Sequence, residues 1–158
     1  MPHLTERFGH FAVALDTTPL SEQVIHHAKR AVIDWYAALV PGLIEAPGPQ
    51  LQAMLAGELD RGPSRLASGR AASARAAALI QGSASHTVEF DDIFRDAIYH
   101  PGAPTISAAW ALAQELGASG AATLRAIIAG YEVSTRIGVA LGRAHYRYWH
   151  NKIGRAHV

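Results

Sequence analysis

The chain has 158 residues, of which 49% are hydrophobic and 17% charged, a composition typical of one folded domain and unlike a disordered segment. Fourteen basic and thirteen acidic residues are scattered along it for a net charge of +1, so it lacks the concentrated basic face that nucleic-acid binding needs. It has no cysteine, no visible signal peptide and no apolar run that could cross a bilayer, and we expect a cytoplasmic protein that binds neither nucleic acid nor membrane.

Apolar residues at helical spacing predict two helices in the first part of the chain. The first covers residues 4–15 and the second 19–41, with Thr18 as the N-cap of the second. A short helix is expected around residues 51–55. Gly62-Pro63 then breaks the chain, because these residues rarely continue a helix.

The second half of the chain predicts three further helices. Residues from about 68 to 86 are rich in alanine, which has high helix propensity and little bulk, so this helix should lie close to its neighbours. The next covers residues 106–116 and ends at Gly117, and Ser119 can cap the last helix. No strand-like alternation persists for more than a few residues. The sequence therefore predicts an all-α fold, a helical bundle.

Acids and histidines gather in the segment between the alanine-rich helix and the next one: His86, Glu89, Asp91, Asp92 and His100. Loops held between rigid helices often display catalytic groups, and neighbouring acids can raise one another's pKa. An imidazole can accept or donate a proton near neutral pH. From the residues alone, two interpretations stay open: a general acid–base site, or solvated loop acids beside an ordinary histidine.

Three separated blocks resemble the signature of the MmgE/PrpD family in their order and spacing. They are residues 81–92, residues 100–104 and residues 129–138. The helix at residues 28–35 resembles the opening of the family, so the similarity covers nearly all of residues 4–150. The family includes 2-methylcitrate dehydratase, cis-aconitate decarboxylase and an iminodisuccinate epimerase.

The resemblance implies a large helical domain, a smaller α/β lid domain, a homodimer, and chemistry without a metal or organic cofactor. Residues 1–151 would be the first part of the helical domain, with the lid absent. We therefore expect a fragment of a lyase or isomerase that acts on small polycarboxylic acids by abstracting or delivering a proton next to a carboxylate.

Family positions also imply residue roles. Glu89 stands where the family usually has aspartate and is the first candidate to contact the moving proton. Asp91 and Asp92 match a pair expected to order the loop and orient neighbouring groups, and His100 could polarise a substrate carboxylate or shuttle a proton. Ile93 replaces a common hydroxyl residue, so one hydrogen bond to the substrate is expected to be missing.

Two more histidines are candidates. His86 could contact substrate or only cap its helix, and His150 resembles the start of a His-x-Thr motif that brings a further active-site histidine. Tyr131 and Glu132 are assigned to packing and helix contacts.

Residues 152–158 read like a translated sequencing adapter, so we expect a non-native tail. The lid and the family's catalytic lysines would then be missing, and residues 1–158 alone should show no turnover, whereas the full-length parent should. Genomic sequence encoding these seven residues and a stop codon would contradict this expectation.

Two other classes of protein remain as alternatives. One is a non-catalytic helical interaction domain. The other is a metal-dependent phosphohydrolase, which usually has an adjacent His-Asp pair that this chain lacks.

Overall fold

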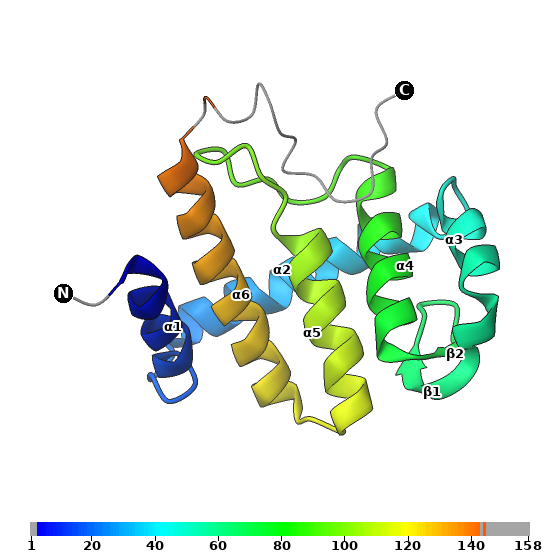
Figure 1. Ribbon diagram of the computed structural model, residues 1–158, viewed down its shortest axis with the longest axis horizontal. Helices are drawn as coiled ribbons and strands as arrows, with labels where there is room; N and C mark the ends of the chain where they lie inside the picture. The colour runs from blue at the N-terminus through cyan, green and yellow to red at the C-terminus, as the bar shows by residue number, and fades with distance from the viewer. Residues whose placement is uncertain (1–2, 143, 145–158) are drawn as a thin grey trace.

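The computed structural model describes residues 3–142 and 144, which form a mostly helical domain (Figure 1). The six α-helices of the described residues are α1 (Leu4–Ala14), α2 (Glu22–Gly42), α3 (Gly48–Met54), α4 (Ala74–Thr87), α5 (Gly102–Leu116) and α6 (Gly120–Leu141). A 3-10 turn, η1 (Ala56–Glu58), leads into a small sheet of β1 (Leu59–Arg65) and β2 (Ala71–Ala72). None of the helices in this part of the chain is long and apolar enough to span a bilayer.

Helices α4, α5 and α6 lie side by side, and α2 runs across them (Figure 1). Helix α1 packs at the α6 side, and the small sheet lies at the opposite edge, next to α4. The loop between α4 and α5 passes over the end of the bundle where α4 and α6 finish and α5 begins. The acidic segment is therefore held at one end of the bundle by three helices.

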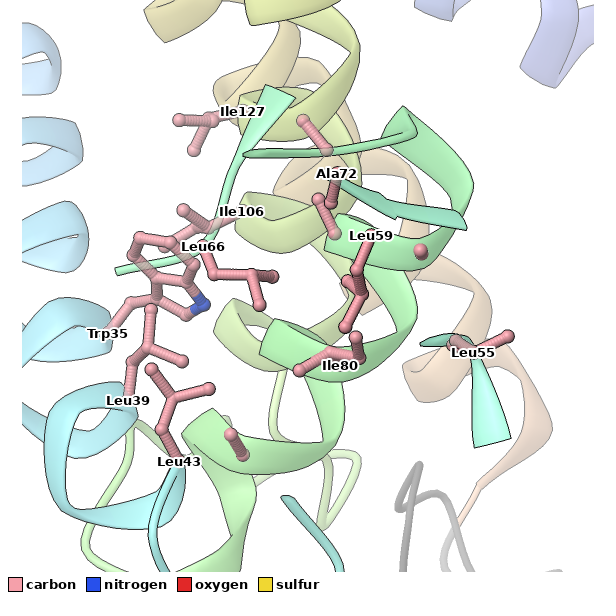
Figure 2. Close-up of a cluster of buried hydrophobic side chains, with 14 residues drawn as sticks. Trp35, Leu39, Leu43, Leu55, Leu59, Leu66, Ala72, Ile80, Ile106 and Ile127 are labelled. Carbon is pink, nitrogen blue, oxygen red and sulfur yellow. The ribbon is translucent and has the colours of Figure 1, made fainter. Parts of the chain in front are cut away.

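The core lies where α2, α4, α5 and α6 meet (Figure 2). Its largest side chains include Trp35, Leu39, Ile80, Ile106 and Ile127, none more than 2% exposed. Burying a side chain of this size contributes about 1.5–3 kcal/mol. The polar edge of the tryptophan is also satisfied, because Trp35 Nε1 donates a hydrogen bond to a serine on α5.

Helices α2 and α4 touch at a glycine. A Cβ atom added to Gly42, the last residue of α2, would collide with the backbone carbonyl of Ala84 on α4. Only a glycine permits this approach without moving one helix. The contact fixes the last turn of α4, which carries His86.

The predicted ends of the last two helices are confirmed. Gly117 adopts the left-handed conformation, with φ 61° and ψ 33°, and terminates α5. Ser119 caps α6, because its hydroxyl oxygen accepts a hydrogen bond from the backbone nitrogen of Ala122. These signals are local, so they can be recognised from the sequence.

The predicted cap of α2 is wrong. Thr18 does not cap this helix, because its hydroxyl donates back to the carbonyl of Ala14 at the end of α1. Ser21 takes the N-cap position and accepts a hydrogen bond from the backbone of Val24. Both residues are competent caps, and the connection between α1 and α2 decides which one is used.

The all-α prediction needs a correction, since β1 and β2 form a two-stranded antiparallel sheet. The sequence shows no alternating pattern at β1, because the register of this strand shifts between Leu59 and Ser64. Pro63 also has no backbone N–H to donate to a neighbouring strand. Strand β2 uses alanines that the sequence assigned to the following helix. Ser73 ends that strand and caps α4, which begins at Ala74.

Candidate active site

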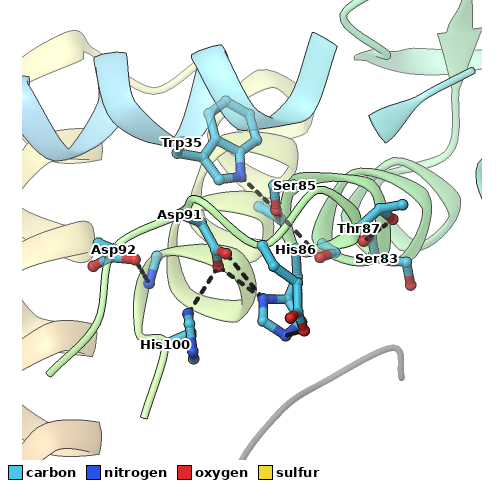
Figure 3. Close-up of polar contacts among 12 residues, drawn as sticks. Trp35, Ser83, Ser85, His86, Thr87, Asp91, Asp92 and His100 are labelled. Atoms are coloured by element: carbon cyan, nitrogen blue, oxygen red, sulfur yellow. Dashed lines mark hydrogen bonds and ion pairs between the residues drawn. The ribbon is translucent and has the colours of Figure 1, made fainter. Parts of the chain in front are cut away.

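The candidate site lies where α4 ends and α5 begins (Figure 3). His86 is in the last turn of α4, Asp91 follows in the loop, and His100 lies two residues before α5. The alanines of α4 allow α2 and α5 to pack closely on both sides of this helix. Small side chains therefore place the histidine of α4 deep in the domain.

Asp91 lies between two imidazole rings. Its Oδ1 and Oδ2 atoms are 3.0 and 2.9 Å from Nδ1 of His86, and Oδ2 is 3.3 Å from Nδ1 of His100. The side chains are 2% exposed for Asp91, 4% for His86 and 10% for His100. A buried carboxylate requires such partners, because an unpaired charge is costly inside a protein.

Two nitrogen atoms of this cluster have no hydrogen-bond partner within the described residues: His86 Nε2 and His100 Nδ1. The short distance from His100 Nδ1 to Asp91 is an ion-pair distance, but its alignment does not make a hydrogen bond. Buried polar atoms without partners are rare in native proteins and need an explanation, of which a catalytic role is one. Since His100 Nδ1 already lies beside Asp91, His86 Nε2 is the nitrogen of this pair that a substrate could engage.

Glu89 borders the cluster on its exposed side. Its backbone adopts φ 55°, a left-handed conformation that is uncommon for residues other than glycine and is enriched at functional sites. Its Oε1 atom lies 3.9 Å from Nε2 of His86, and its side chain is 40% exposed. Glu89 thus lies between the buried Nε2 atom of His86 and the solvent.

Asp92 is directed away from this cluster (Figure 3). Its Oδ1 accepts a hydrogen bond from the backbone nitrogen of Gly102 at 3.0 Å, and its Oδ2 accepts one from the Tyr131 hydroxyl at 2.9 Å. Burial raises the pKa of the Asp92 carboxyl above its usual range, against the opposing effect of these hydrogen bonds. Asp92 therefore joins the start of α5 to α6.

The shifted pKa of Asp92 gives a testable pH dependence. A carboxyl with a raised folded-state pKa binds its proton more tightly when folded, so its contribution to stability is lost as pH rises from about 3.9, the usual aspartate value, through the raised one. Asp92→Asn removes this titration. We expect the difference in unfolding free energy, variant minus natural chain, to increase as pH rises from about 3 to about 7. Urea unfolding across this range measures the difference, and a constant difference would contradict the prediction.

The remaining predicted residues lie outside the cluster. Ile93 is 53% exposed and is followed by a turn that Phe94 and Tyr99 close through backbone hydrogen bonds. His150 lies outside the described residues. The structure thus brings together His86, Asp91 and His100, with Glu89 beside them.

Sequence reasoning missed one partner. Tyr131, assigned to packing, supplies the hydroxyl that holds Asp92 from 39 positions away in the chain. Burial raises the pKa of this hydroxyl, with the nearby Asp92 carboxylate adding to the effect, so it stays a donor at neutral pH. No local pattern signals such a long-range hydrogen bond.

A large apolar groove lies away from this site. It has a volume of about 940 Å³ and lies between α2, α5 and α6, with Ile25, Trp110 and Leu124 among its mostly apolar lining. It includes the turn from α5 to α6, at the opposite end of these helices from the acidic loop. Its lining lacks the acids and imidazoles of proton-transfer chemistry, so we place the candidate site at the cluster.

A metal is the other possible use of three such side chains. His86, Asp91 and His100 offer ligand atoms that all lie within 4.8 Å of one another. However, the 2.9 Å from His86 Nδ1 to Asp91 Oδ2 is a typical charge-assisted hydrogen bond. Two ligands of a tetrahedral zinc ion with bonds of 2.0–2.1 Å lie about 3.3 Å apart. The His86–Asp91 contact therefore fits a hydrogen-bonded pair, whereas the 3.3 Å from His100 Nδ1 to Asp91 Oδ2 matches the spacing of two zinc ligands.

Two buried imidazoles that share a carboxylate, at one end of a helical bundle, are side chains of the kind that general acid–base chemistry uses. Residues 6–154 match the family model described as the MmgE/PrpD N-terminal domain. The chain therefore belongs to the MmgE/PrpD family. A search of curated proteins gave no match.

Proposed function

We propose that this chain belongs to a lyase or isomerase that moves a proton next to a carboxylate of a small polycarboxylic acid, in the manner of 2-methylcitrate dehydratase. The reaction uses no metal or organic cofactor, and the enzyme works as a homodimer in the cytoplasm. Membership of the MmgE/PrpD family supports the reaction class. The fold and the chemistry of the cluster agree with it.

One observation carries the proposal: buried Asp91 lies between the imidazoles of His86 and His100, with the carboxylate of Glu89 beside them. Four ionisable side chains thus meet within the last turn of α4 and the loop that follows it. A surface cluster of acids would instead be solvated and far from any imidazole. Correctly placed acid–base groups each contribute about 10² to 10⁴ in rate.

The proposed chemistry begins with a base that removes the proton from a carbon next to a substrate carboxylate. The electron pair of the broken C–H bond delocalises into that carboxylate. In a dehydration it then expels the hydroxyl group on the next carbon, which leaves as water after an acid protonates it. In an epimerisation the carbon instead receives a proton on its other face. In this proposal His100 polarises a substrate carboxylate during the proton transfer.

Deuterium labelling tests the proposal directly. The product of the complete open reading frame is incubated in D₂O with 2-methylcitrate, cis-aconitate or iminodisuccinate and followed by proton NMR. We expect deuterium next to a carboxylate, or a dehydrated, decarboxylated or epimerised product, from at least one substrate. We also propose that residues 1–158 alone give neither signal. An absence of exchange and of product with the complete protein would reject the function.

The activity should not depend on a metal. Treatment with an excess of EDTA followed by desalting should leave kcat/KM within about twofold, because hydrogen bonds and charges of the chain carry the proposed chemistry. Activity is measured before chelation, after it and after adding Zn²⁺ or Fe²⁺. A loss that one of these ions restores would contradict cofactor independence.

A further inference from the structure

We propose that His86 is the general base of the site and that Asp91 is the positioning residue that fixes its tautomer. Asp91 holds the proton on Nδ1, which leaves the lone pair of Nε2 to accept the proton of the substrate. This inference rests on the proposed function, because it names the group that performs the proton abstraction. It differs from the expectation drawn from the sequence. There Glu89 is the first candidate to contact the moving proton, and His86 is a substrate contact or a helix cap.

The hydrogen bond between Asp91 and His86 sets the tautomer. Both carboxylate oxygens lie within hydrogen-bond distance of Nδ1, at 3.0 and 2.9 Å. An ionised carboxylate can only accept, so Nδ1 must be the donor and carry the proton. In a neutral imidazole the other nitrogen, Nε2, is then the acceptor.

The surroundings of Nε2 fit the role of a base. It is buried, as part of a side chain only 4% exposed, and has no hydrogen-bond partner among the described residues. A structural histidine usually has both ring nitrogens satisfied, because a buried acceptor left alone costs about 1–3 kcal/mol. The nitrogen that Asp91 leaves unprotonated is thus also the one left for a substrate.

His100 is less suited to be the base. Its Nδ1 lies 3.3 Å from Asp91 without the alignment of a hydrogen bond, so its tautomer is not fixed by that carboxylate. Its ring lies 4.6 Å from that of His86, centroid to centroid, with the planes tilted by 60°. This position suits a group that binds a substrate carboxylate beside the base.

The path of the proton follows from the distances. The proton moves from the substrate carbon to Nε2, and the C–H electron pair remains on the substrate. The imidazolium that forms is stabilised by the Asp91 carboxylate, which stays ionised. Glu89 Oε1, 3.9 Å from Nε2 and on a partly exposed side chain, is placed to take the proton onward. Glu89 then carries the proton between His86 and the leaving group or solvent.

The first test reads the tautomer and needs no turnover. Long-range proton–nitrogen NMR of the ¹⁵N-histidine-labelled chain, at a pH where the ring is neutral, reports which nitrogen of His86 carries the proton. We expect it on Nδ1 in the natural chain and in the matched control Asp96→Asn, whose aspartate is exposed in the same loop. Asp91→Asn should lower the Nδ1–H fraction. A proton on Nε2 in the natural chain would overturn the inference.

The second test uses the complete enzyme. His86→Gln and Asp91→Asn should each lower kcat by about 10² to 10⁴ and change KM by less than about threefold. The double variant should lose little more than the worse single variant, because residues that act as a unit are not additive. Asp96→Asn should keep its activity. An activity of His86→Gln within threefold of the natural enzyme overturns the inference while the proposed function stands, whereas a natural enzyme without turnover rejects that function instead.

A metal would also overturn the inference. In a calorimetric titration with Zn²⁺, the natural chain and the His86→Gln variant should give the same result, with no binding of one ion per chain that depends on His86. Binding of one ion per chain that this substitution removes would assign His86 as a ligand.

Discussion

Gly42→Ala should destabilise the domain by about 3 kcal/mol, the upper part of the range for overpacking in a well-packed interior. The added methyl group would overlap the backbone carbonyl of Ala84, and a backbone atom cannot move aside as a flexible side chain can. Helices α2 and α4 must therefore separate. Urea unfolding followed by circular dichroism gives the change in the free energy of unfolding.

Gly9→Ala is the matched control. Gly9 lies inside α1, and nothing is within 4 Å of the place a Cβ would take. Alanine is the better helix former by about 1 kcal/mol, so this variant should be as stable as the natural chain or more stable. Equal effects of the two substitutions would show that α2 and α4 do not approach as described.

Glu89→Gln should lower kcat/KM of the complete enzyme by about 10² to 10⁴, because it removes a proton-carrying group while keeping the shape of the side chain. The free energy of unfolding should change by less than about 0.5 kcal/mol, as is usual for a partly exposed substitution. Steady-state kinetics with the substrate identified by labelling, together with urea unfolding, separate the two effects.

Glu89→Asp and Glu45→Gln complete this experiment. Aspartate restores the usual family residue, keeps a carboxylate and is tolerated in the left-handed conformation that residue 89 adopts. It should keep at least about a tenth of the activity, because a carboxylate shifted by one methylene still reaches the proton. Glu45 is exposed and far from the loop in sequence, so its substitution should be neutral. Full activity of Glu89→Gln would remove this residue from the proton path.

Local signals made much of the fold predictable. Helical spacing identified α1, α2, α5 and α6, alanine content identified α4, and Gly117 and Ser119 mark a stop and a cap through hydrogen bonds within a few residues. The choice between Thr18 and Ser21 was missed because either side chain can cap, and the Thr18 hydroxyl is instead bonded to the carbonyl of Ala14 in α1. The small sheet was missed because β1 is irregular and does not alternate.

The candidate site was predictable as a segment but not as a geometry. Spacing and family resemblance identified the segment from His86 to His100. They did not indicate that Asp91 bonds to the imidazole of α4, or that Asp92 bonds to a tyrosine on α6. The partner of each aspartate depends on which helix its side chain faces, and this follows only from the packing of α4, α5 and α6.

Two consecutive aspartates, one facing the histidines and the other facing Tyr131, make the sequence order in this turn decisive. If the pair were shifted by one position, the carboxylate that now contacts His86 and the carboxylate that now connects α5 and α6 would no longer be at the right places. Mutational surveys that score both acids as equivalent would therefore merge two phenotypes. Loss at Asp91 should slow the proposed reaction and also cost stability, because the buried Nδ1 donor of His86 loses its partner. Loss at Asp92 should weaken the connection between α5 and α6 while the other acid and both histidines remain.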